Sequence, residues 1–190
     1  FFADTPKIIT TNKKGQAPYY AYYDQNAATI ILYPAGVGKG PFPNDQKFQP
    51  WDGYGTATVL NDHHYTWGYF ISAAAEIAFD NTTWMEEHKD VINQLVYDVA
   101  YSGSGSTGAN NFKYPKMRMW DPYIGHCEAV GMIGEYSTGN NDESISEEIH
   151  FWAGVIRWGS ASNQKEIETL GIQHYTQAVY AYYTFWRDYF

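Results

Sequence analysis

Two acidic segments of this chain contain the residue types that acid–base chemistry requires. The first, residues 61–70, reads NDHHYTWGYF, so Asp62 precedes two histidines and a run of aromatic residues. A carboxyl group among aromatic rings loses hydration, which raises its pKa and lets it donate a proton near neutral pH. Asp62 is therefore a candidate general acid. The alternative is that Asp62 caps a helix and that the histidines lie at the surface or at the edge of the core.

The second acidic segment, residues 139–148, reads GNNDESISEE and holds four acids within seven residues. Glu143 and Glu147 are four residues apart, so the start of a helix would direct both toward the same side. The alternative explanation is that acids gather at the positive N-terminal end of a helix. Two separate carboxylate sites, one acting as acid and one as base beside aromatic rings that hold the substrate, are typical of glycoside hydrolysis.

Metal-ligating residue types are also present, but their spacing does not predict a catalytic metal. The side chains that could ligate a divalent ion are His63, His64, His126, Asp62, Glu143 and Glu147. Glu147 and His150 form one Glu-x-x-His unit, whereas a di-iron bundle needs two. The sequence contains no His-Glu-x-x-His motif, which is the usual zinc signature on a helix. We therefore expect no catalytic metal.

The composition excludes several classes of function. The 12 Lys and Arg residues against 21 Asp and Glu residues give a net charge of −9, which leaves few cations to replace the counterions of a nucleic acid. The longest apolar run, Ala27 to Tyr33, is far too short for a membrane-spanning helix. Neither a nucleic-acid nor a membrane partner is expected. Aromatic residues make up 18% of the chain, which suits a wide, half-wet groove as well as a core.

The elements that would position the acids differ between the two parts of the chain. Six of the eight prolines lie in residues 1–60, which predicts turns, and two β-like runs, 19–23 and 28–33, predict a hairpin. From Tyr65 onward, apolar residues at helical spacing predict a helix. A capping box at Thr83–Glu86 predicts the start of a second helix.

Three further helices are expected in the second half of the chain. Asp-Pro at the start of residues 121–133 predicts a short helix there. A second capping box predicts a helix over residues 144–158 that ends at Gly159, and the last helix covers residues 162–190. The chain is thus expected to be mainly α, a single core in which residues 61–190 carry the site and follow an irregular, partly β N-terminal segment.

Three blocks of this sequence resemble the signature blocks of glycoside hydrolase family 81. They are residues 61–71 (NDHHYTWGYFI), 118–126 (RMWDPYIGH) and 139–147 (GNNDESISE). Their order and spacing also resemble that family, and the resemblance covers about residues 20–190. It implies part of an (α/α)6-barrel-like helical domain. It also implies an endo-acting β-1,3-glucanase, secreted or associated with a cell wall, that inverts the anomeric centre without a cofactor.

The resemblance also implies roles for individual residues. Asp62, in the first block, is expected to be the general acid, Glu143, in the third block, the general base, and Glu147 a supporting residue of the site. Inversion needs room for a water molecule, so we expect roughly 6.5–9.5 Å between the carboxyl groups of Asp62 and Glu143. The residues expected to bind the sugar by polar contacts or ring stacking are His64, Trp67, Tyr69, Arg118, Trp120, Asp121 and His126.

Three departures from the family pattern keep other hypotheses open. Thr66 stands where the family usually has histidine, and Glu128 where it has tryptophan. The family's proteins are several times longer, so this chain is either a catalytic core excised from a larger protein or a reduced relative. Companion domains or a homo-oligomer would then cover exposed apolar flanks. The alternatives to a β-1,3-glucanase are a non-catalytic β-glucan-binding module and a helical hydrolase of another polysaccharide.

Overall fold

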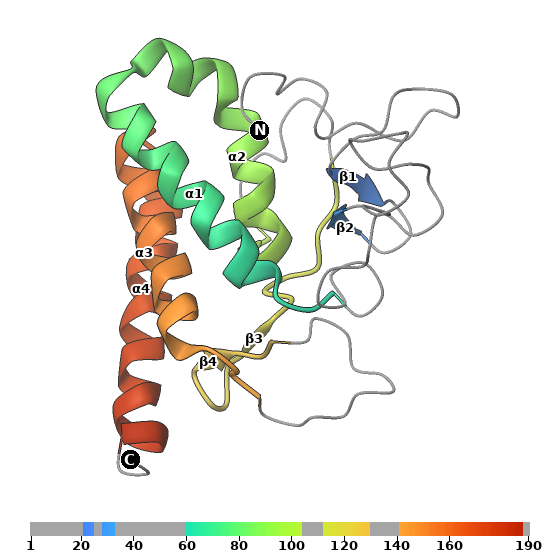
Figure 1. Ribbon diagram of the computed structural model, residues 1–190, viewed down its shortest axis with the longest axis vertical. Coiled ribbons are helices and arrows are strands. Elements are labelled where there is room, and N and C mark those ends of the chain that lie inside the picture. The colour runs from blue at the N-terminus through green and yellow to red at the C-terminus, as the bar shows by residue number, and fades with distance from the viewer. Residues whose placement is uncertain (1–20, 25–27, 33–59, 104–111, 130–140, 188–190) are drawn as a thin grey trace, which may run out of the picture.

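The prediction of a mainly helical chain is confirmed. A computed structural model describes residues 21–24, 28–32, 60–103, 112–129 and 141–187 (Figure 1). The helices in these segments are α1 (His63–Asp80), α2 (Thr82–Ala100), α3 (Ile145–Ala161) and α4 (Lys165–Ala181), with a π-helical turn, Tyr182–Trp186, continuing α4. Among the helices of these segments, none has both the length and the apolar character needed to cross a membrane.

The predicted hairpin is present near the N-terminus. Strand β1 (Ala21–Asp24) pairs antiparallel with β2 (Thr29–Leu32), and Tyr23 lies opposite Ile30. Both of these side chains are buried. The ring of Tyr23 stacks on that of Phe112, with 4.1 Å between the ring centroids. The hairpin is therefore attached to the segment that follows α2.

The helices pack in a fixed order that small residues make possible. Helix α3 lies between α1 and α4, and α2 packs against α1 (Figure 1). A Cβ atom on Gly68 of α1 would lie 3.0 Å from the Cα of Phe151, and one on Gly171 of α4 would lie 2.8 Å from the backbone nitrogen of Ile156. Both distances are too short for an ordinary side chain, so glycine allows the helix backbones to approach closely.

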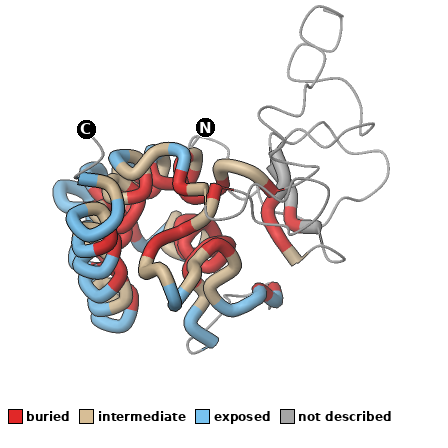
Figure 2. The backbone as a smooth tube through the Cα atoms, turned by 90° about the horizontal axis from the view of Figure 1, so that it is seen from below, coloured by how far each residue is buried: buried red, intermediate tan, exposed pale blue. Residues whose placement is uncertain are grey.

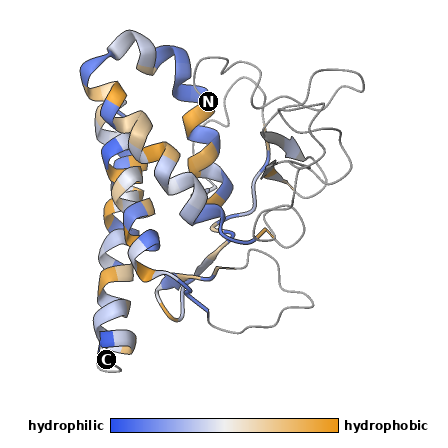
Figure 3. Ribbon diagram, in the orientation of Figure 1, coloured by the Kyte–Doolittle hydropathy of each residue, from blue (hydrophilic) through white to orange (hydrophobic). Residues whose placement is uncertain are grey.

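Aromatic side chains fill the space between the helices. Trp67, Phe151, Trp152 and Trp158 are fully buried. In Figure 2 the buried residues face inward, while α4 carries exposed residues along its outer side. Figure 3 shows hydrophobic and hydrophilic residues alternating along the same helices, as expected when each helix buries one face.

The boundaries of three predicted helices differ in the structure. The last helix, α4, begins at Lys165 and not near residue 162. The capping box at Thr83 does not form, because Asn81 Oδ1 accepts a 2.9 Å hydrogen bond from the backbone N–H of Trp84. Helix α2 therefore begins at Thr82, and its N-cap lies two residues before the predicted one. Helix α3 begins directly after Ser144, as predicted, although the Ser144 side chain makes no capping hydrogen bond. The helix runs past Gly159 to Ala161, because this glycine packs against the first turns of α4 instead of ending the helix.

The predicted helix after Asp121 is also wrong for the residues that the structure describes there. Instead, β3 (Trp120–Asp121) pairs antiparallel with β4 (His126–Cys127). Asp121 Oδ1 accepts a 2.7 Å hydrogen bond from the backbone N–H of Tyr123. An aspartate that bonds to the backbone two residues ahead forms a turn, which competes with helix capping. Residues 130–133 of the predicted helix lie outside the described residues.

Candidate active site

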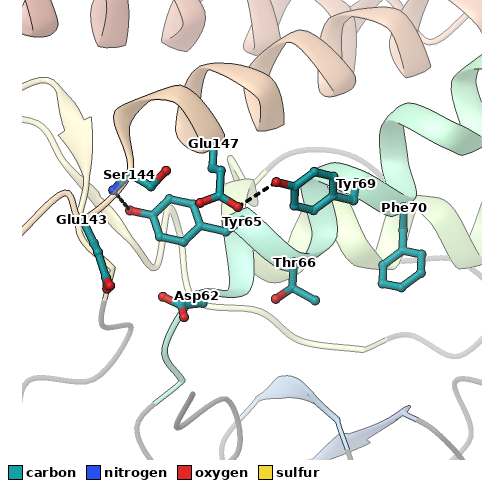
Figure 4. A pocket seen from close by; sticks show the side chains of 8 residues that line it. All are labelled: Asp62, Tyr65, Thr66, Tyr69, Phe70, Glu143, Ser144 and Glu147. Carbon is teal, nitrogen blue, oxygen red and sulfur yellow. Dashed lines mark hydrogen bonds between the residues drawn. The ribbon is translucent and has the colours of Figure 1, made fainter. Parts of the chain in front are cut away.

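A pocket of about 610 Å³ lies where the first turns of α1 meet the start of α3 (Figure 4). Its lining residues are Asp62, Tyr65, Thr66, Tyr69, Phe70, Glu143, Ser144 and Glu147. The fold thus brings together the two acidic segments that the sequence separates. All three carboxylates predicted to be catalytic, together with Tyr69, line this one pocket.

Asp62 has the properties of an acid that keeps its proton to a higher pH than an ordinary aspartate. It lies at the start of α1 in the left-handed conformation, with φ 58°, which aspartate tolerates better than most residues. Its side chain makes no capping hydrogen bond, and Oδ1 is buried without a hydrogen-bond partner among the described residues. Burial, and then the negative charges of Glu143 and Glu147, raise the pKa of Asp62 to about 6. The structure therefore does not support the capping alternative.

The two glutamates enter the pocket from the start of α3. Glu143 is exposed and directly precedes Ser144, the residue before the helix, whereas Glu147 lies in the first turn. Tyr69 donates a 2.8 Å hydrogen bond to Oε1 of Glu147, as Figure 4 shows. This hydrogen bond, and the negative charge of Glu147, raise the pKa of the Tyr69 hydroxyl. Glu147 is thus held from α1, while Glu143 is accessible to solvent.

Tyr65 fixes the start of α3 against α1. Its hydroxyl donates a 3.0 Å hydrogen bond to Asp142 Oδ1 and accepts one of 3.0 Å from the backbone N–H of Ser144. The two bonded residues flank Glu143 in the sequence, so Tyr65 restrains the segment that carries this glutamate. Tyr65, like Thr66, Phe70 and Ser144, was not predicted to belong to the site. Tyr65, Thr66 and Phe70 lie on α1. Counting forward from Asp62 at helical spacing would have identified these three residues.

A buried carboxylate, Asp98 of α2, holds the first turn of α1 in place. It accepts hydrogen bonds from His63 Nδ1 at 2.6 Å and from Trp67 Nε1 at 2.8 Å. It also accepts bonds from Thr29 Oγ1 at 2.7 Å and from the backbone N–H of Ile30 at 2.8 Å. Burial opposes ionisation of Asp98, but the charge and hydrogen bond of His63, the charge of Arg118 and the hydrogen bond from Thr29 together outweigh it and lower the pKa of Asp98. This network joins the hairpin, α1 and α2 directly behind Asp62.

His64 and Trp67, both expected to bind the sugar, lie outside the pocket lining. Both side chains are fully buried. Neither ring nitrogen of His64 has a hydrogen-bond partner among the described residues, and burial lowers its pKa to about 3, so the ring stays neutral. Trp67 is occupied by its hydrogen bond to Asp98. The helical turn that points Asp62 into the pocket points these two rings into the core.

Four more predicted sugar-binding residues lie outside the pocket lining. Arg118 donates a hydrogen bond to the backbone oxygen of Ala28, and Asp121 closes the turn between β3 and β4. The ring of Trp120 packs edge-on against His174, with 4.5 Å between the centroids. His126 is fully buried. Each of these side chains has a contact within the protein or is buried, and their binding to the sugar stays a prediction.

A family model, individual relatives and a solved structure all place this chain in one family. Residues 13–188 match the family described as the glycosyl hydrolase family 81 C-terminal domain. A glucan endo-1,3-beta-D-glucosidase from Acetivibrio thermocellus is 36% identical over 180 residues, which are 94% of this chain and 20% of that protein. One from Thermobifida fusca is 31% identical over 169 residues, which are 88% of this chain and 19% of that protein.

A solved structure supports the same comparison. It is that of a mutant family 81 glycoside hydrolase from Clostridium thermocellum, which matches with a TM-score of 0.72 and 35% sequence identity, over 94% of this chain and 22% of that chain. The match confirms the predicted fold class, part of an (α/α)6-barrel-like helical domain. The chain spans about a fifth of the length of the relatives that it matches.

Proposed function

The chain belongs to glycoside hydrolase family 81, and from this membership we propose that it carries out inverting endo-hydrolysis of β-1,3-glucan. The relatives named above are glucan endo-1,3-beta-D-glucosidases, which supports the substrate class. The single observation that carries the proposal is the pocket in which Asp62, Glu143 and Glu147 meet. A carboxyl group with a pKa of about 6 faces an exposed glutamate there.

The proposed reaction uses one acid and one base. Asp62 donates its proton to the glycosidic oxygen as the bond to the anomeric carbon breaks, and Glu143 takes a proton from the water that attacks the opposite face of the sugar. Two functions for two carboxylates require different environments. The half-buried Asp62 and the exposed Glu143 fit this requirement. Glu147 supports the site, since its negative charge helps to keep Asp62 protonated.

The remaining lining residues suit a sugar chain. Tyr65, Tyr69 and Phe70 present aromatic rings to the pocket, and aromatic side chains offer large apolar faces to a ligand. The hydroxyl of Tyr69 and the side chains of Thr66 and Ser144 add polar groups at the same lining. We propose these residues, rather than the buried His64 and Trp67, as the contacts to the glucan.

Location and partners are part of the proposal. We expect the chain to act outside the cell or at a cell wall, where polymeric glucans occur. Ile77 and Phe79 on α1, and Ile172 on α4, are exposed large apolar residues. We expect companion domains or a second copy of the chain to cover them. Size-exclusion chromatography with light scattering, at several protein concentrations, separates a monomer from a homo-oligomer.

The test is to incubate the chain with laminarin and to follow the anomeric form of the products by NMR as they appear. Initial α-anomer from the β-linked substrate would show hydrolysis with inversion. Initial β-anomer would refute the roles of Asp62 and Glu143 as acid and base across a water. Binding without any product would instead favour a non-catalytic glucan-binding module, and Thr66→His would be the first change to make.

The substrate class needs a parallel comparison. The same chain is incubated with β-1,3-glucan, β-1,4-glucan and mixed-linkage glucan at equal mass, and soluble reducing ends are measured over time. We expect product from the β-1,3-linked polymer at a rate at least ten times that from the β-1,4-linked one. Equal or reversed rates would favour a helical hydrolase of another polysaccharide.

A further inference from the structure

Three buried side chains near the pocket, but outside its lining, leave polar atoms unpaired. His126, Asp142 and Glu148 each place a nitrogen or oxygen atom within 4.8 Å of those of the other two. His126 and Glu148 have no exposed surface, and Asp142 is 8% exposed. Nε2 of His126, Oδ2 of Asp142 and Oε2 of Glu148 have no hydrogen-bond partner within the described segments. Three unpaired polar groups in one buried cluster are rare, because each loses its hydration without replacement.

The other polar atom of each side chain is anchored. His126 Nδ1 lies 2.6 Å from the backbone oxygen of Cys127, and since that oxygen can accept but not donate, Nδ1 carries the hydrogen. Asp142 Oδ1 accepts from Tyr65. Glu148 Oε1 accepts from the backbone N–H of Cys127 at 2.8 Å and from Trp152 Nε1 at 3.0 Å. Each residue is thus oriented from behind and leaves one atom free.

The free atoms are all electron-pair donors when His126 is neutral and both carboxyl groups are ionised. With hydrogen on Nδ1, its Nε2 presents a lone pair, as do the two carboxylates. The two carboxyl groups are buried close together, and two negative charges in such a place are costly when nothing neutralises them. Positive charge placed between the three atoms would remove this cost. A histidine whose second nitrogen donates to a backbone oxygen is also the usual arrangement around a protein-bound metal.

We propose that His126, Asp142 and Glu148 form a buried binding site for a divalent cation of the Zn²⁺ class. One imidazole nitrogen and two carboxylate oxygens suit Zn²⁺, whereas Ca²⁺ and Mg²⁺ prefer oxygen ligands alone. The site has a structural role, because none of the three residues lines the pocket. Asp142 directly precedes Glu143 and Glu148 directly follows Glu147, so the cation would fix both ends of the segment that carries these glutamates.

The first experiment measures metal in the untagged chain. The protein is treated with a chelator, dialysed, and then equilibrated with Zn²⁺, Mn²⁺ or Ca²⁺ before elemental analysis and thermal unfolding. We expect one Zn²⁺ per chain and a rise in Tm of about 5 °C at saturation, with a smaller effect of Ca²⁺. If the chain does not bind one equivalent of Zn²⁺ when Zn²⁺ is supplied at millimolar concentration, the proposal is overturned. Protons alone would then neutralise the negative charge of the cluster.

Neighbouring residues provide matched variants. Glu148→Gln removes a proposed ligand, whereas Glu147→Gln changes the adjacent residue, which faces the pocket. We expect Glu148→Gln to weaken Zn²⁺ binding by about 100-fold or more and Glu147→Gln to retain it. The reverse result would place the metal in the pocket and refute the proposal. His126→Gln, with His150→Gln as its control, repeats the comparison at the nitrogen ligand.

A spectroscopic measurement keeps the proposal testable if the ligand variants fail to fold. Co²⁺ added to the metal-free, unaltered chain should give the visible absorption bands of a low-symmetry N/O site, and Zn²⁺ should displace them at one equivalent. Bands that one equivalent of Zn²⁺ does not displace would contradict a single shared site. None of these readouts requires hydrolysis of glucan, so their failure would leave the proposed activity unaffected.

Discussion

The hydroxyl of Tyr69 donates a 2.8 Å hydrogen bond to Oε1 of Glu147, so an exposed side chain of α1 holds a carboxylate on the first turn of α3. This bond crosses the pocket lining and connects the two acidic segments. It is made at the surface, so it contributes little to folding. Its main effect is to hold Glu147 in position, and the negative charge of Glu147 raises the pKa of Asp62.

Replacing Tyr69 with phenylalanine tests this connection. The ring stays and the hydrogen bond is lost, so we expect kcat on laminarin to fall by about tenfold, with KM changed by less than a factor of three and Tm by less than 2 °C. Steady-state rates and thermal unfolding measure these quantities. Tyr180→Phe, at an exposed tyrosine of α4, is the control. Full activity of Tyr69→Phe would show that Glu147 does not depend on this bond.

Replacing Glu143 with glutamine tests the proposed base. The amide cannot take a proton from the attacking water, so we expect turnover to fall by about 10²–10⁴-fold, while binding of a β-1,3-glucan oligosaccharide is retained. Calorimetry measures the binding and single-turnover assays the rate. Because Glu143 is exposed, the thermal unfolding midpoint of the variant should equal that of the wild type. A variant that keeps a third of the wild-type rate would exclude Glu143 as the base.

The pH dependence of kcat/KM tests the proposed acid. Asp62 must be protonated to act, and its pKa is about 6, so activity should fall tenfold per pH unit well above pH 6. Glu147→Gln removes one negative charge that raises this pKa, and the alkaline limb should therefore move to lower pH. A limb that stays in place or moves upward in Glu147→Gln would contradict the assignment to Asp62.

Replacing Asp98 with asparagine tests the buried network behind the site. The amide loses the charge and cannot accept from all four donors, so we expect about 3 kcal/mol of lost stability in urea unfolding. The pKa of Asp98 is lowered in the folded state, so its contribution is present above the unfolded pKa of about 3.9 and is lost as the pH falls through the folded value. Asp80→Asn, at the exposed end of α1, should cost under 0.5 kcal/mol. A loss below 1 kcal/mol in Asp98→Asn would show that the network is not needed for folding.

Replacing Gly159 with alanine tests the contact between α3 and α4. Alanine normally stabilises a helix interior by about 1 kcal/mol relative to glycine. Here the added Cβ would lie 2.3 Å from the backbone nitrogen of Glu168, so the helices must separate, and we expect a net loss of about 2 kcal/mol. Ser160→Ala, at the exposed neighbouring position, is the control for helix propensity. A more stable Gly159→Ala variant would show that the two helices adjust freely.

Local sequence patterns predicted the elements but not all of their ends. The hairpin and the helices that begin near Tyr65, Thr83 and Ser144 follow from periodicity and composition, which depend on neighbouring residues. Their boundaries depend on competition between nearby side chains. Asn81 caps α2 in place of Thr83, and Asp121 makes a turn instead of starting a helix. The same residue types favour both outcomes, so sequence alone does not choose between them.

The identity of the available acids, and the place of each acidic segment at the start of a helix, could be read from the sequence. Asp62 before α1, and Glu143 and Glu147 at the start of α3, follow from local patterns. Which neighbouring side chains face the pocket depends on the packing of the helices. Tyr65 is held by Asp142, and Trp67 is withdrawn into the core by Asp98. These partners are 77 and 31 residues away in the sequence. Burial depends on contacts between such distant residues. The periodicity of apolar residues along one helix therefore does not predict it.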